Sequence, residues 1–227
     1  MPYNVIITGA TGMVGKGVLF ECMDHVDIGK ILLVNRSSVG ITHPKVQEVL
    51  IEDFFNLDSI KEEMTGYHAC FFCLGITSIG QSEVNYSRIT YDLTLKFANH
   101  FLEKNARSIF CYVSGTGTDS TEKGRSMWAR VKGKTENDLL ALEFKKAYMF
   151  RPGYIQPLRG IKSKTNWYQA LYNVFKPIYF ILKHFPSTAT NTTNMGLAMI
   201  HTLDGNYPKT VLENKEINQL SNAEHKS

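Results

Sequence analysis

The sequence predicts a doubly wound, parallel α/β sheet, and three observations lead to that class. Short apolar runs alternate with amphipathic segments over the first 150 residues. The runs are continuously apolar, which is typical of strands that helices cover on both faces. A glycine-rich turn, Gly9–Gly15, follows the first run and opens the first amphipathic segment. The 227 residues fit one α/β domain with a small appendage.

The elements follow in order along the chain. The apolar runs predict strands at Asn4–Thr8, Ile31–Asn35, Val46–Ile51, Ala69–Leu74, Ser108–Val113 and Ala147–Phe150. The amphipathic segments predict helices at Met13–Met23, Leu57–Met64, Glu83–Lys104 and Ser126–Leu142. The connections are too short to change sheets. We therefore expect one sheet, with a ligand crevice at the carboxyl ends of its strands.

The pattern changes after Arg151-Pro152-Gly153. We therefore expect a core over residues 1–155 and a C-terminal lid or substrate segment of the same domain over residues 156–227. That segment is predicted to hold a polar loop at Gln156–Asn166, an aromatic-rich helix from Trp167, a helix at Thr193–Leu203 and a late strand at Thr210–Leu212. The stretch from Asn214 is polar, and we expect its end to be frayed.

The composition excludes several classes of protein. A hydrophobic content of 43% with 20% charged residues excludes disorder and coiled coil. The net charge of +4 (25 Lys and Arg less 21 Asp and Glu) is too small to indicate nucleic-acid binding. Four cysteines and no recognisable signal peptide favour a reducing compartment. The apolar stretch Trp167–Phe185 is interrupted by polar residues, so we expect a cytoplasmic protein without a transmembrane segment.

The glycine-rich turn predicts a dinucleotide site of the Rossmann type. Gly9 allows a tight turn, Gly12 lets the backbone approach a pyrophosphate, and Gly15 lets the helix pack on the strand. The phosphates would meet free N–H groups at the positive end of a helix. Thr11, Met13 and Val14 belong to the same turn and are expected to contact the cofactor. The alternative is a glycine turn that binds nothing.

The end of the second strand favours NADP over NAD. NAD sites commonly place an acid about 20 residues beyond the glycine motif, where it holds the ribose 2′-hydroxyl. Here that position reads Asn35-Arg36-Ser37. No carboxylate repels a 2′-phosphate, and the Arg36 guanidinium can pair with it. The alternative is that Arg36 is simply a solvated loop residue.

Together with further motifs, these residues resemble the short-chain dehydrogenase/reductases, in the atypical branch related to the Tat-interactive protein. The motifs are Gly9–Gly15, Asn35-Arg36, Cys73–Thr77, Val113–Gly115 and Phe150–Gly153. The resemblance implies that Asp53 and Phe54 lie beside the adenine and that Leu74 and Gly75 lie along the adenosine ribose and phosphates. It also implies that Ser114 polarises a substrate carbonyl. The segment containing Pro152 would then pass close to the nicotinamide.

The chain departs from that family at its catalytic pair. The family pattern is Tyr-x-x-x-Lys, with the lysine on the nicotinamide ribose, and here Trp128 precedes Lys132 at that spacing. The spacing places both side chains on one helix face. An indole N–H does not ionise near neutral pH, however, so Trp128 cannot shuttle a proton. Three interpretations stay open: another hydroxyl is the acid (Tyr86, Tyr112, Tyr154 or Ser114), the protein binds NADP without turnover, or Trp128 only packs.

Other candidates are interpreted as structural. Cys70 and Cys73 form a C-x-x-C string on a predicted strand, where residues three apart face opposite sides, so we expect core thiols. Cys22 and Cys111 are interpreted in the same way. The seven histidines show no metal-ligand spacing, and no metal site is proposed. The polar stretch Thr118–Arg125 is expected to be a loop near the crevice.

The sequence therefore predicts an NADP(H)-binding oxidoreductase that acts on an unidentified carbonyl or alcohol. Ser114, Lys132 and Trp128 would occupy its catalytic positions. The alternative is a catalytically impaired NADP-binding regulator that acts through a protein partner.

Overall fold

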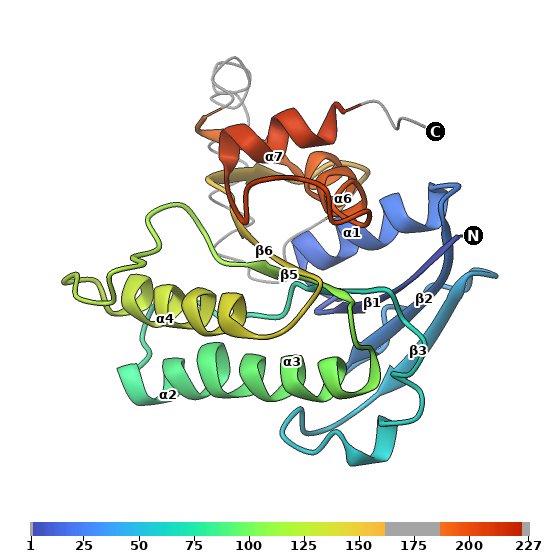
Figure 1. Ribbon diagram of the computed structural model, residues 1–227, viewed down its shortest axis with the longest axis horizontal. Helices are drawn as coiled ribbons and strands as arrows, with labels where there is room; N and C mark the ends of the chain where they lie inside the picture. The colour runs from blue at the N-terminus through green and yellow to red at the C-terminus, as the bar shows by residue number, and fades with distance from the viewer. Residues whose placement is uncertain (1, 162–186, 224–227) are drawn as a thin grey trace.

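The computed structural model describes residues 2–161 and 187–223 and contains a seven-stranded parallel sheet. The strand order is β3-β2-β1-β4-β5-β6-β9 (Figure 1). The strands are β1 (Tyr3–Thr8), β2 (Ile28–Asn35), β3 (Val46–Leu50), β4 (Ala69–Phe72), β5 (Ile109–Val113), β6 (Lys146–Arg151) and β9 (Val211–Glu213). The predicted doubly wound sheet is confirmed. Its order reverses between β1 and β4, which is where such sheets bind ligands.

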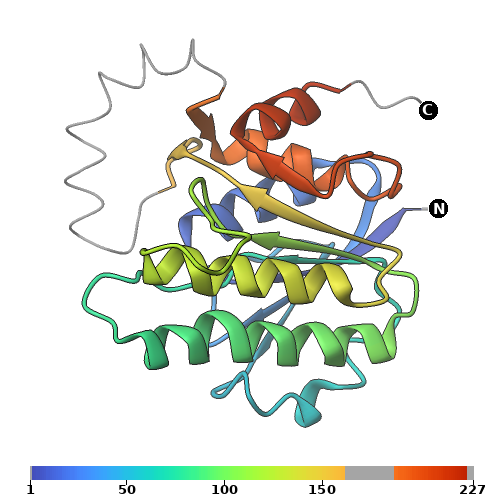
Figure 2. The same ribbon diagram turned by 60° about the vertical axis from the view of Figure 1, so that its left-hand side comes forward.

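Helices cover both faces of this sheet (Figures 1 and 2). One face carries α1 (Met13–Asp24), α6 (Thr192–Ile200) and α7 (Asn214–Ser221). The other carries α2 (Glu83–Ser87), α3 (Leu93–Lys104) and α4 (Met127–Ala141). A separate parallel pair joins β7 (Tyr154–Gln156) to β8 (Ala189–Asn191).

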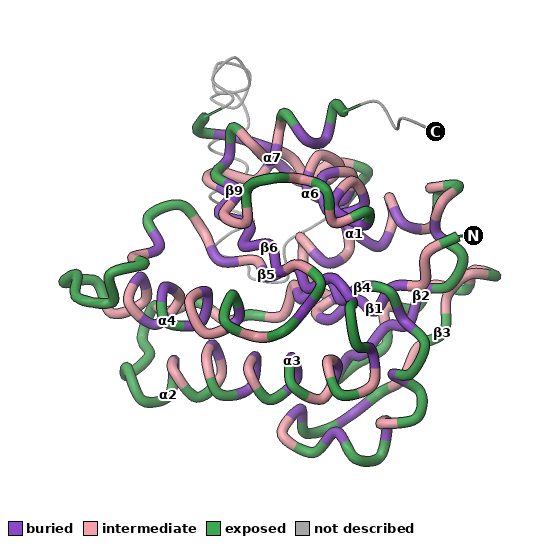
Figure 3. Tube along the Cα trace, in the orientation of Figure 1, coloured by how far each residue is buried: buried purple, intermediate pink, exposed green. Residues whose placement is uncertain are grey.

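The core lies in two layers, one on each side of the sheet, and the central strands are almost wholly buried (Figure 3). Ile7 belongs to the cluster under α1 and α6, whereas Ile6 belongs to the cluster under α3. Successive residues of one strand therefore feed opposite layers. In the second layer, the Phe110 ring stacks between Phe72 and Phe144, with centroids 5.9 and 5.1 Å away.

Glycines allow α1 and α6 to approach closely. A Cβ on Gly17 would lie 2.6 Å from Cβ of Thr192, and one on Gly196 would lie 2.6 Å from Cγ of Glu21. The C-terminal residues thus pack on the first helix and contribute β9 to the main sheet. The division between residues 155 and 156 stays a prediction.

Two helix predictions need correction. The segment Leu57–Met64 forms only a 3-10 turn, η1 (Asp58–Ile60), followed by hydrogen-bonded turns. Burial of Leu57, Ile60 and Met64 explains its apolar spacing, but so short a segment does not offset the cost of helix nucleation. The predicted helix Glu83–Lys104 is helical throughout, but it is not one α-helix. A π-helical turn, η2 (Arg88–Asp92), separates α2 from α3.

The sequence also missed elements in the C-terminal part. The polar stretch from Asn214 forms α7, because Ile217 and Leu220 occur one turn apart and are buried against the first core layer. The strands β7 and β8 are three residues long and carry no clear pattern. The predicted helix from Trp167 and residues 162–166 of the polar loop before it lie outside the described residues. Within residues 2–161 and 187–223, no helix has the length and apolar character that crossing a membrane requires.

Candidate functional site

A cleft of about 760 Å³ opens at the carboxyl ends of β1, β2, β4 and β5. Ten of the predicted site residues line it: Gly9, Thr11, Gly12, Met13, Val14, Arg36, Leu74, Gly75, Ser114 and Lys132. The sequence missed seven others: Asn35, Ser37, Cys73, Ile76, Thr77, Gln81 and Val113. Most of these stand at or just beyond the end of a predicted strand, and that position was the signal that could have identified them.

The glycine turn at the start of α1 is shaped by close backbone contacts. Gly9 has φ +68°, and a Cβ there would lie 2.8 Å from the backbone of Cys73 and Leu74. A Cβ on Gly15 would lie 2.4 Å from the Gly9 carbonyl oxygen. Only glycine meets both constraints without moving the backbone. The turn therefore runs directly beside the end of β4.

The N-terminus of α1 faces this cleft and suits a phosphate. The helix begins after Gly12, with no side-chain cap and no acidic residue in its first turn. The first backbone N–H groups of α1 therefore keep their hydrogens for a ligand, and the helix dipole favours an anion. Gly12, Met13 and Val14 all line the cleft at this point. The residues present thus fit a nucleotide diphosphate.

The end of β2 carries one cation that is open to the cleft. Arg36 is exposed, lines the cleft with Ser37, and makes no ion pair within the described residues. Beside it, the buried Asn35 accepts a hydrogen bond from the Ala10 N–H at 3.2 Å. This bond ties the end of β2 to the glycine turn.

Glu48 of β3 is a nearby carboxylate that the sequence analysis did not consider. It accepts hydrogen bonds from Asn35 Nδ2 and from the Val39 N–H, each at 3.0 Å, and from the Ser38 hydroxyl. Glu48 is not among the described residues that line the cleft. Its charge therefore organises the loop after β2.

Three residues predicted to contact the cofactor do not line the cleft within the described part of the chain. Asp53 is exposed and accepts a hydrogen bond from the Phe55 N–H at 2.8 Å. The Phe54 ring is only 3% exposed and lies 6.2 Å from the Phe97 ring, so it serves the core. Pro152 is buried, and its carbonyl accepts a hydrogen bond from the Thr116 N–H at 2.9 Å.

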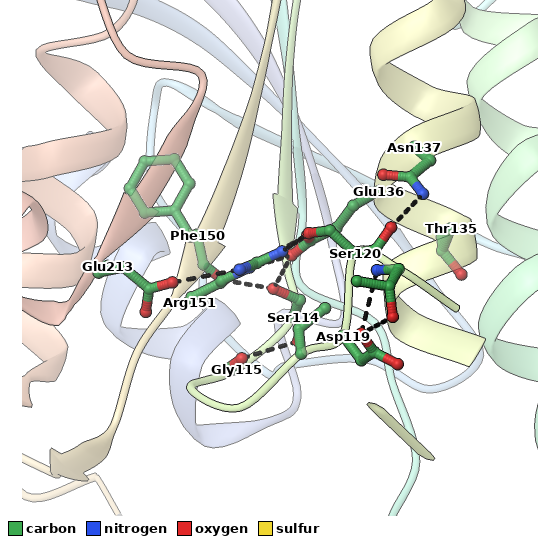
Figure 4. Close-up of polar contacts among 12 residues, drawn as sticks. Ser114, Gly115, Asp119, Ser120, Thr135, Glu136, Asn137, Phe150, Arg151 and Glu213 are labelled. Atoms are coloured by element: carbon green, nitrogen blue, oxygen red, sulfur yellow. Dashed lines mark hydrogen bonds and ion pairs between the residues drawn. The ribbon is translucent and has the colours of Figure 1, made fainter. Parts of the chain in front are cut away.

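A buried ionic network lies behind Ser114 (Figure 4). The Glu136 carboxylate, only 1% exposed, accepts hydrogen bonds from the Ser114 hydroxyl and from the Arg151 guanidinium. Arg151 also pairs with Glu213 at 3.2 Å and donates to Ser120 Oγ at 2.6 Å. These contacts raise the pKa of Arg151, mainly through the hydrogen bonds to Glu136. This network could not be predicted from the sequence, because its members come from separate parts of the fold: the loop after β5, α4, β6 and β9.

This network determines what Ser114 can offer a ligand. Its Oγ has two acceptors within reach: Glu136 and, at 3.1 Å, the Phe150 carbonyl. A hydroxyl carries one hydrogen, so that hydrogen is already taken. In this arrangement the hydroxyl hydrogen stays within the network, and the carbonyl-polarising role that the family resemblance implies for Ser114 stays a prediction.

Lys132 reaches into the cleft from α4, and Trp128 does not. Lys132 Nζ donates to the Ser114 carbonyl at 2.6 Å and to the Val113 carbonyl at 3.3 Å. Burial lowers the pKa of Lys132 to about 8, although the Glu136 carboxylate opposes that shift. The Trp128 indole lies instead beside Gly117, where a Cβ would come within 3.4 Å of the ring.

The alternative hydroxyls considered from the sequence also lie away from the described cleft. Tyr86 and Tyr112 are each 2% exposed, and burial raises the pKa of both. The Tyr154 hydroxyl donates to Gln156 Oε1 at 2.9 Å. None of these three tyrosines is among the described residues that line the cleft.

The cysteines are free thiols: Cys22, Cys70 and Cys111 are buried in the core, and Cys73 is partly buried and lines the cleft. Cys70 belongs to the second core layer, whereas Cys73 packs against the first, so they face opposite sides of the sheet as predicted. Burial raises the pKa of both thiols. Within the described residues, no group of three or more His, Cys, Asp or Glu side chains is arranged to hold a metal ion.

Comparison with solved structures identifies the fold. The fold matches carbonyl reductase Sniffer of D. melanogaster with a TM-score of 0.62 and 11% identity, over 95% of this chain and 98% of that one. It also matches the Bordetella bronchiseptica enzyme WbmG in complex with NAD and UDP, with a TM-score of 0.67 and 9% identity, over 97% of this chain and 78% of that one. The chain therefore has the Rossmann fold of the short-chain dehydrogenase/reductases and related epimerases.

Curated proteins also match the chain in sequence. It is 28% identical to Protein HTATIP2 of Rattus norvegicus over 166 residues, 72% of this chain and 67% of that protein. It is 27% identical to the mitochondrial protein FMP52 of Debaryomyces hansenii over 200 residues, 86% of each chain. The match to FMP52 of Eremothecium gossypii covers 67% of this chain but 66% of that protein. No family model matches the chain. Homology to HTATIP2 and FMP52, together with the fold, confirms the predicted resemblance to the atypical short-chain dehydrogenase/reductases.

The expected cytoplasmic localisation is contradicted by these relatives. The FMP52 proteins that match this chain, from several fungi, are named mitochondrial. The expectation was wrong because it depended on free thiols and on the lack of an export signal. Both features argue against an oxidising compartment, but neither distinguishes the cytoplasm from an organelle.

Proposed function

We propose that this chain binds NADP(H) in the cleft and is an oxidoreductase for a small carbonyl or alcohol substrate. The observation that carries the proposal is the composition of one wall of the cleft. The uncapped N-terminus of α1 offers N–H groups to a diphosphate, and the unpaired Arg36 lies at the end of β2. A guanidinium pairs well with a phosphate, and that pairing favours NADP over NAD.

Each part of the cleft has a role in this proposal. The glycine turn would hold the pyrophosphate, Arg36 and Ser37 the 2′-phosphate, and Leu74 and Gly75 the adenosine ribose and phosphates. Gly75 leaves room for a ligand, since a Cβ there would meet nothing within 4 Å. When bound, the nicotinamide supplies or accepts a hydride. Lys132, Ser114 and Val113 line the cleft where the substrate would lie.

The test has two stages. NADPH and NADH are first titrated into the protein, with nicotinamide fluorescence as the signal, and we expect saturable binding with a preference for NADPH. Consumption of NADPH is then followed at 340 nm across a panel of aldehydes and ketones. Turnover of at least one carbonyl supports the oxidoreductase. If NADPH does not bind, the whole proposal is wrong.

A second candidate function is an NADP-binding regulator with little or no turnover. The observation that favours it is Trp128, whose indole stands at the tyrosine position and lies beside Gly117. A positioned acid is typically worth about 10²–10⁴-fold in rate, so its loss could leave binding without catalysis. A Trp128→Tyr variant that gains turnover from an inactive wild type would favour this candidate.

We also propose a mitochondrial location, by analogy with the FMP52 relatives. Expression of the full chain with a C-terminal fluorescent tag, followed by fractionation, tests this. Co-purification with the mitochondrial fraction is the expected result. A signal confined to the soluble fraction would contradict it.

A further inference from the structure

We propose that Lys132 is itself the proton donor to the substrate oxygen in this chain. This inference depends on the proposed oxidoreductase function. It assigns to the lysine a task that a neighbouring tyrosine would otherwise perform.

The other candidate donors are already engaged, lie elsewhere or are too weakly acidic. Ser114 gives its one hydrogen to Glu136 or to the Phe150 carbonyl. The side chains of Trp128, Tyr86 and Tyr112 are absent from the described lining. Thr11, Ser37 and Thr77 line the cleft, but an aliphatic hydroxyl is a very weak acid. Cys73 also lines it, and burial raises the pKa of its thiol.

Lys132 retains a hydrogen that it can use. An ammonium carries three N–H donors. Two of those of Lys132 point at the carbonyls of Ser114 and Val113, 2.6 and 3.3 Å away. The third is left for a group in the cleft, beside the lone pairs of Ser114. The two carbonyl contacts also hold Nζ in place, so that third donor has a defined position at the end of β5.

The charged and titratable groups around Lys132 come from several elements. Glu136 follows it by one turn on α4, and Arg151 of β6 neutralises that carboxylate. The Tyr112 ring of β5 lies below it, with the ring centroid 5.8 Å from Nζ. Tyr86 of α2 interacts with Tyr112. Both phenols are buried and have raised pKa values, so neither adds negative charge near neutral pH.

This environment leaves an ammonium that can lose its proton. Burial lowers the pKa of Lys132 to about 8, well within reach of a working pH. In the reduction, bound NADPH would supply the hydride that the carbonyl carbon receives. Lys132 Nζ gives its proton to the carbonyl oxygen and is left as a neutral amine. The alcohol leaves, and Lys132 regains a proton from water.

The sign of the pH dependence follows from this step. Reduction needs the ammonium, so its rate should be constant below about pH 8 and fall roughly tenfold per pH unit above it. Oxidation of the alcohol needs the neutral amine and should show the opposite dependence. Arginine retains the positive charge but does not release a proton at these pH values. A Lys132→Arg variant should therefore lose turnover, by about 10²–10⁴-fold, and lose the pH dependence near 8.

The first measurement does not require a substrate. Lysine labelled with ¹³C at Cε is titrated by NMR in the free and the NADP⁺-loaded protein, and the Lys132 signal is assigned by its loss in Lys132→Arg. We expect a midpoint near 8 for Lys132. Lys134, which pairs with Asp138 on the exposed side of α4 and has a raised pKa, should titrate well above that. A Lys132 midpoint at or above 10 would overturn the inference.

The second measurement separates this inference from the proposed function. NADPH affinity and turnover are compared for wild type, Lys132→Arg and the matched control Lys134→Arg. The inference predicts that Lys132→Arg loses kcat while its Kd for NADPH changes less than about threefold, and that the control behaves as wild type. If Lys132→Arg loses affinity and keeps kcat, Lys132 only binds the cofactor and the inference is wrong. If the wild-type protein does not bind NADPH, the proposed function is wrong, and this inference falls with it.

Discussion

At the scale of single residues, the proposed preference for NADP over NAD depends on Arg36. Arg36 lines the cleft and makes no ion pair among the described residues, and Glu48 of β3 is engaged by three donors from the end of β2 and the loop after it. The preference for NADP was predicted from the sequence. The sequence could not show that the Glu48 carboxylate of β3 binds the end of β2 and the loop after it, and that Glu48 is not among the described residues that line the cleft.

An Arg36→Ala variant should therefore lose affinity for NADPH and leave affinity for NADH nearly unchanged. A hydrogen bond to a charged group contributes about 1.5–3 kcal/mol, which corresponds to roughly 10- to 100-fold in Kd. Fluorescence titration of both cofactors measures the change. Lys96→Ala removes the same charge from the exposed side of α3 and serves as the control. Equal losses for both cofactors would refute the role of Arg36.

Glu136 and Glu213 bind the same arginine but differ in exposure, and this gives a second prediction. Glu136 is 1% exposed and Arg151 is 11% exposed, whereas Glu213 is 49% exposed. Removing one partner of a buried pair costs about 3–5 kcal/mol, because the other charge is left unpaired. An exposed pair contributes only about 0–1 kcal/mol.

In urea denaturation, Glu136→Gln should therefore lose several kcal/mol of unfolding free energy, and Glu213→Gln should stay within about 1 kcal/mol of wild type. Similar values for the two variants would show that the network does not have the burial described here. Ser114 could be predicted as a site residue from the sequence, but Glu136 could not, because nothing in the helix pattern distinguishes a buried glutamate on α4 from its solvated neighbours.

At the scale of elements, the loop before α4 depends on one glycine. A Cβ on Gly133 would lie 1.8 Å from the Asp119 carbonyl oxygen, so the loop rests directly on the helix at that point. The Asp119 N–H donates to the Ala129 carbonyl at 3.1 Å, and its carboxylate accepts from the Gly124 N–H at 2.6 Å. The predicted loop Thr118–Arg125 is thus held in place on α4, a contact between backbones that no sequence pattern reports.

Gly133→Ala tests this packing, because two effects oppose each other. In an unobstructed helix the change would stabilise the protein by about 1 kcal/mol. Here the methyl group must displace the loop, and overpacking typically costs about 1–3 kcal/mol. We expect net destabilisation in urea and faster tryptic cleavage at Lys123 or Arg125. A stabilised variant would contradict the close approach.

The elements that the sequence predicted well are those with long, regular patterns. The strands β1, β4, β5 and β6 and the helices α1 and α4 were found within two residues at each end. The failures share a cause. In η1, in α7 and in the short strands β7 and β8, tertiary contacts decide the structure, and the local pattern is weak or misleading.

At the scale of the whole molecule, the cleft exists because the strand order reverses between β1 and β4. That reversal brings together the glycine turn, the end of β2 and the end of β5, which are far apart in the sequence. The order of predicted elements was enough to place the crevice. Within that frame, the sequence identified most of the lining on the α1 side, where the motif is local. It missed the network behind Ser114, where α4, β5, β6 and β9 converge.

A crystal structure of the protein soaked with NADP⁺ tests the central claim most directly. The account predicts density for the pyrophosphate over the first N–H groups of α1, with the 2′-phosphate within hydrogen-bond distance of the Arg36 guanidinium. A cleft that stays empty at saturating NADP⁺, or a nucleotide whose 2′-phosphate points away from Arg36 into solvent, would contradict it.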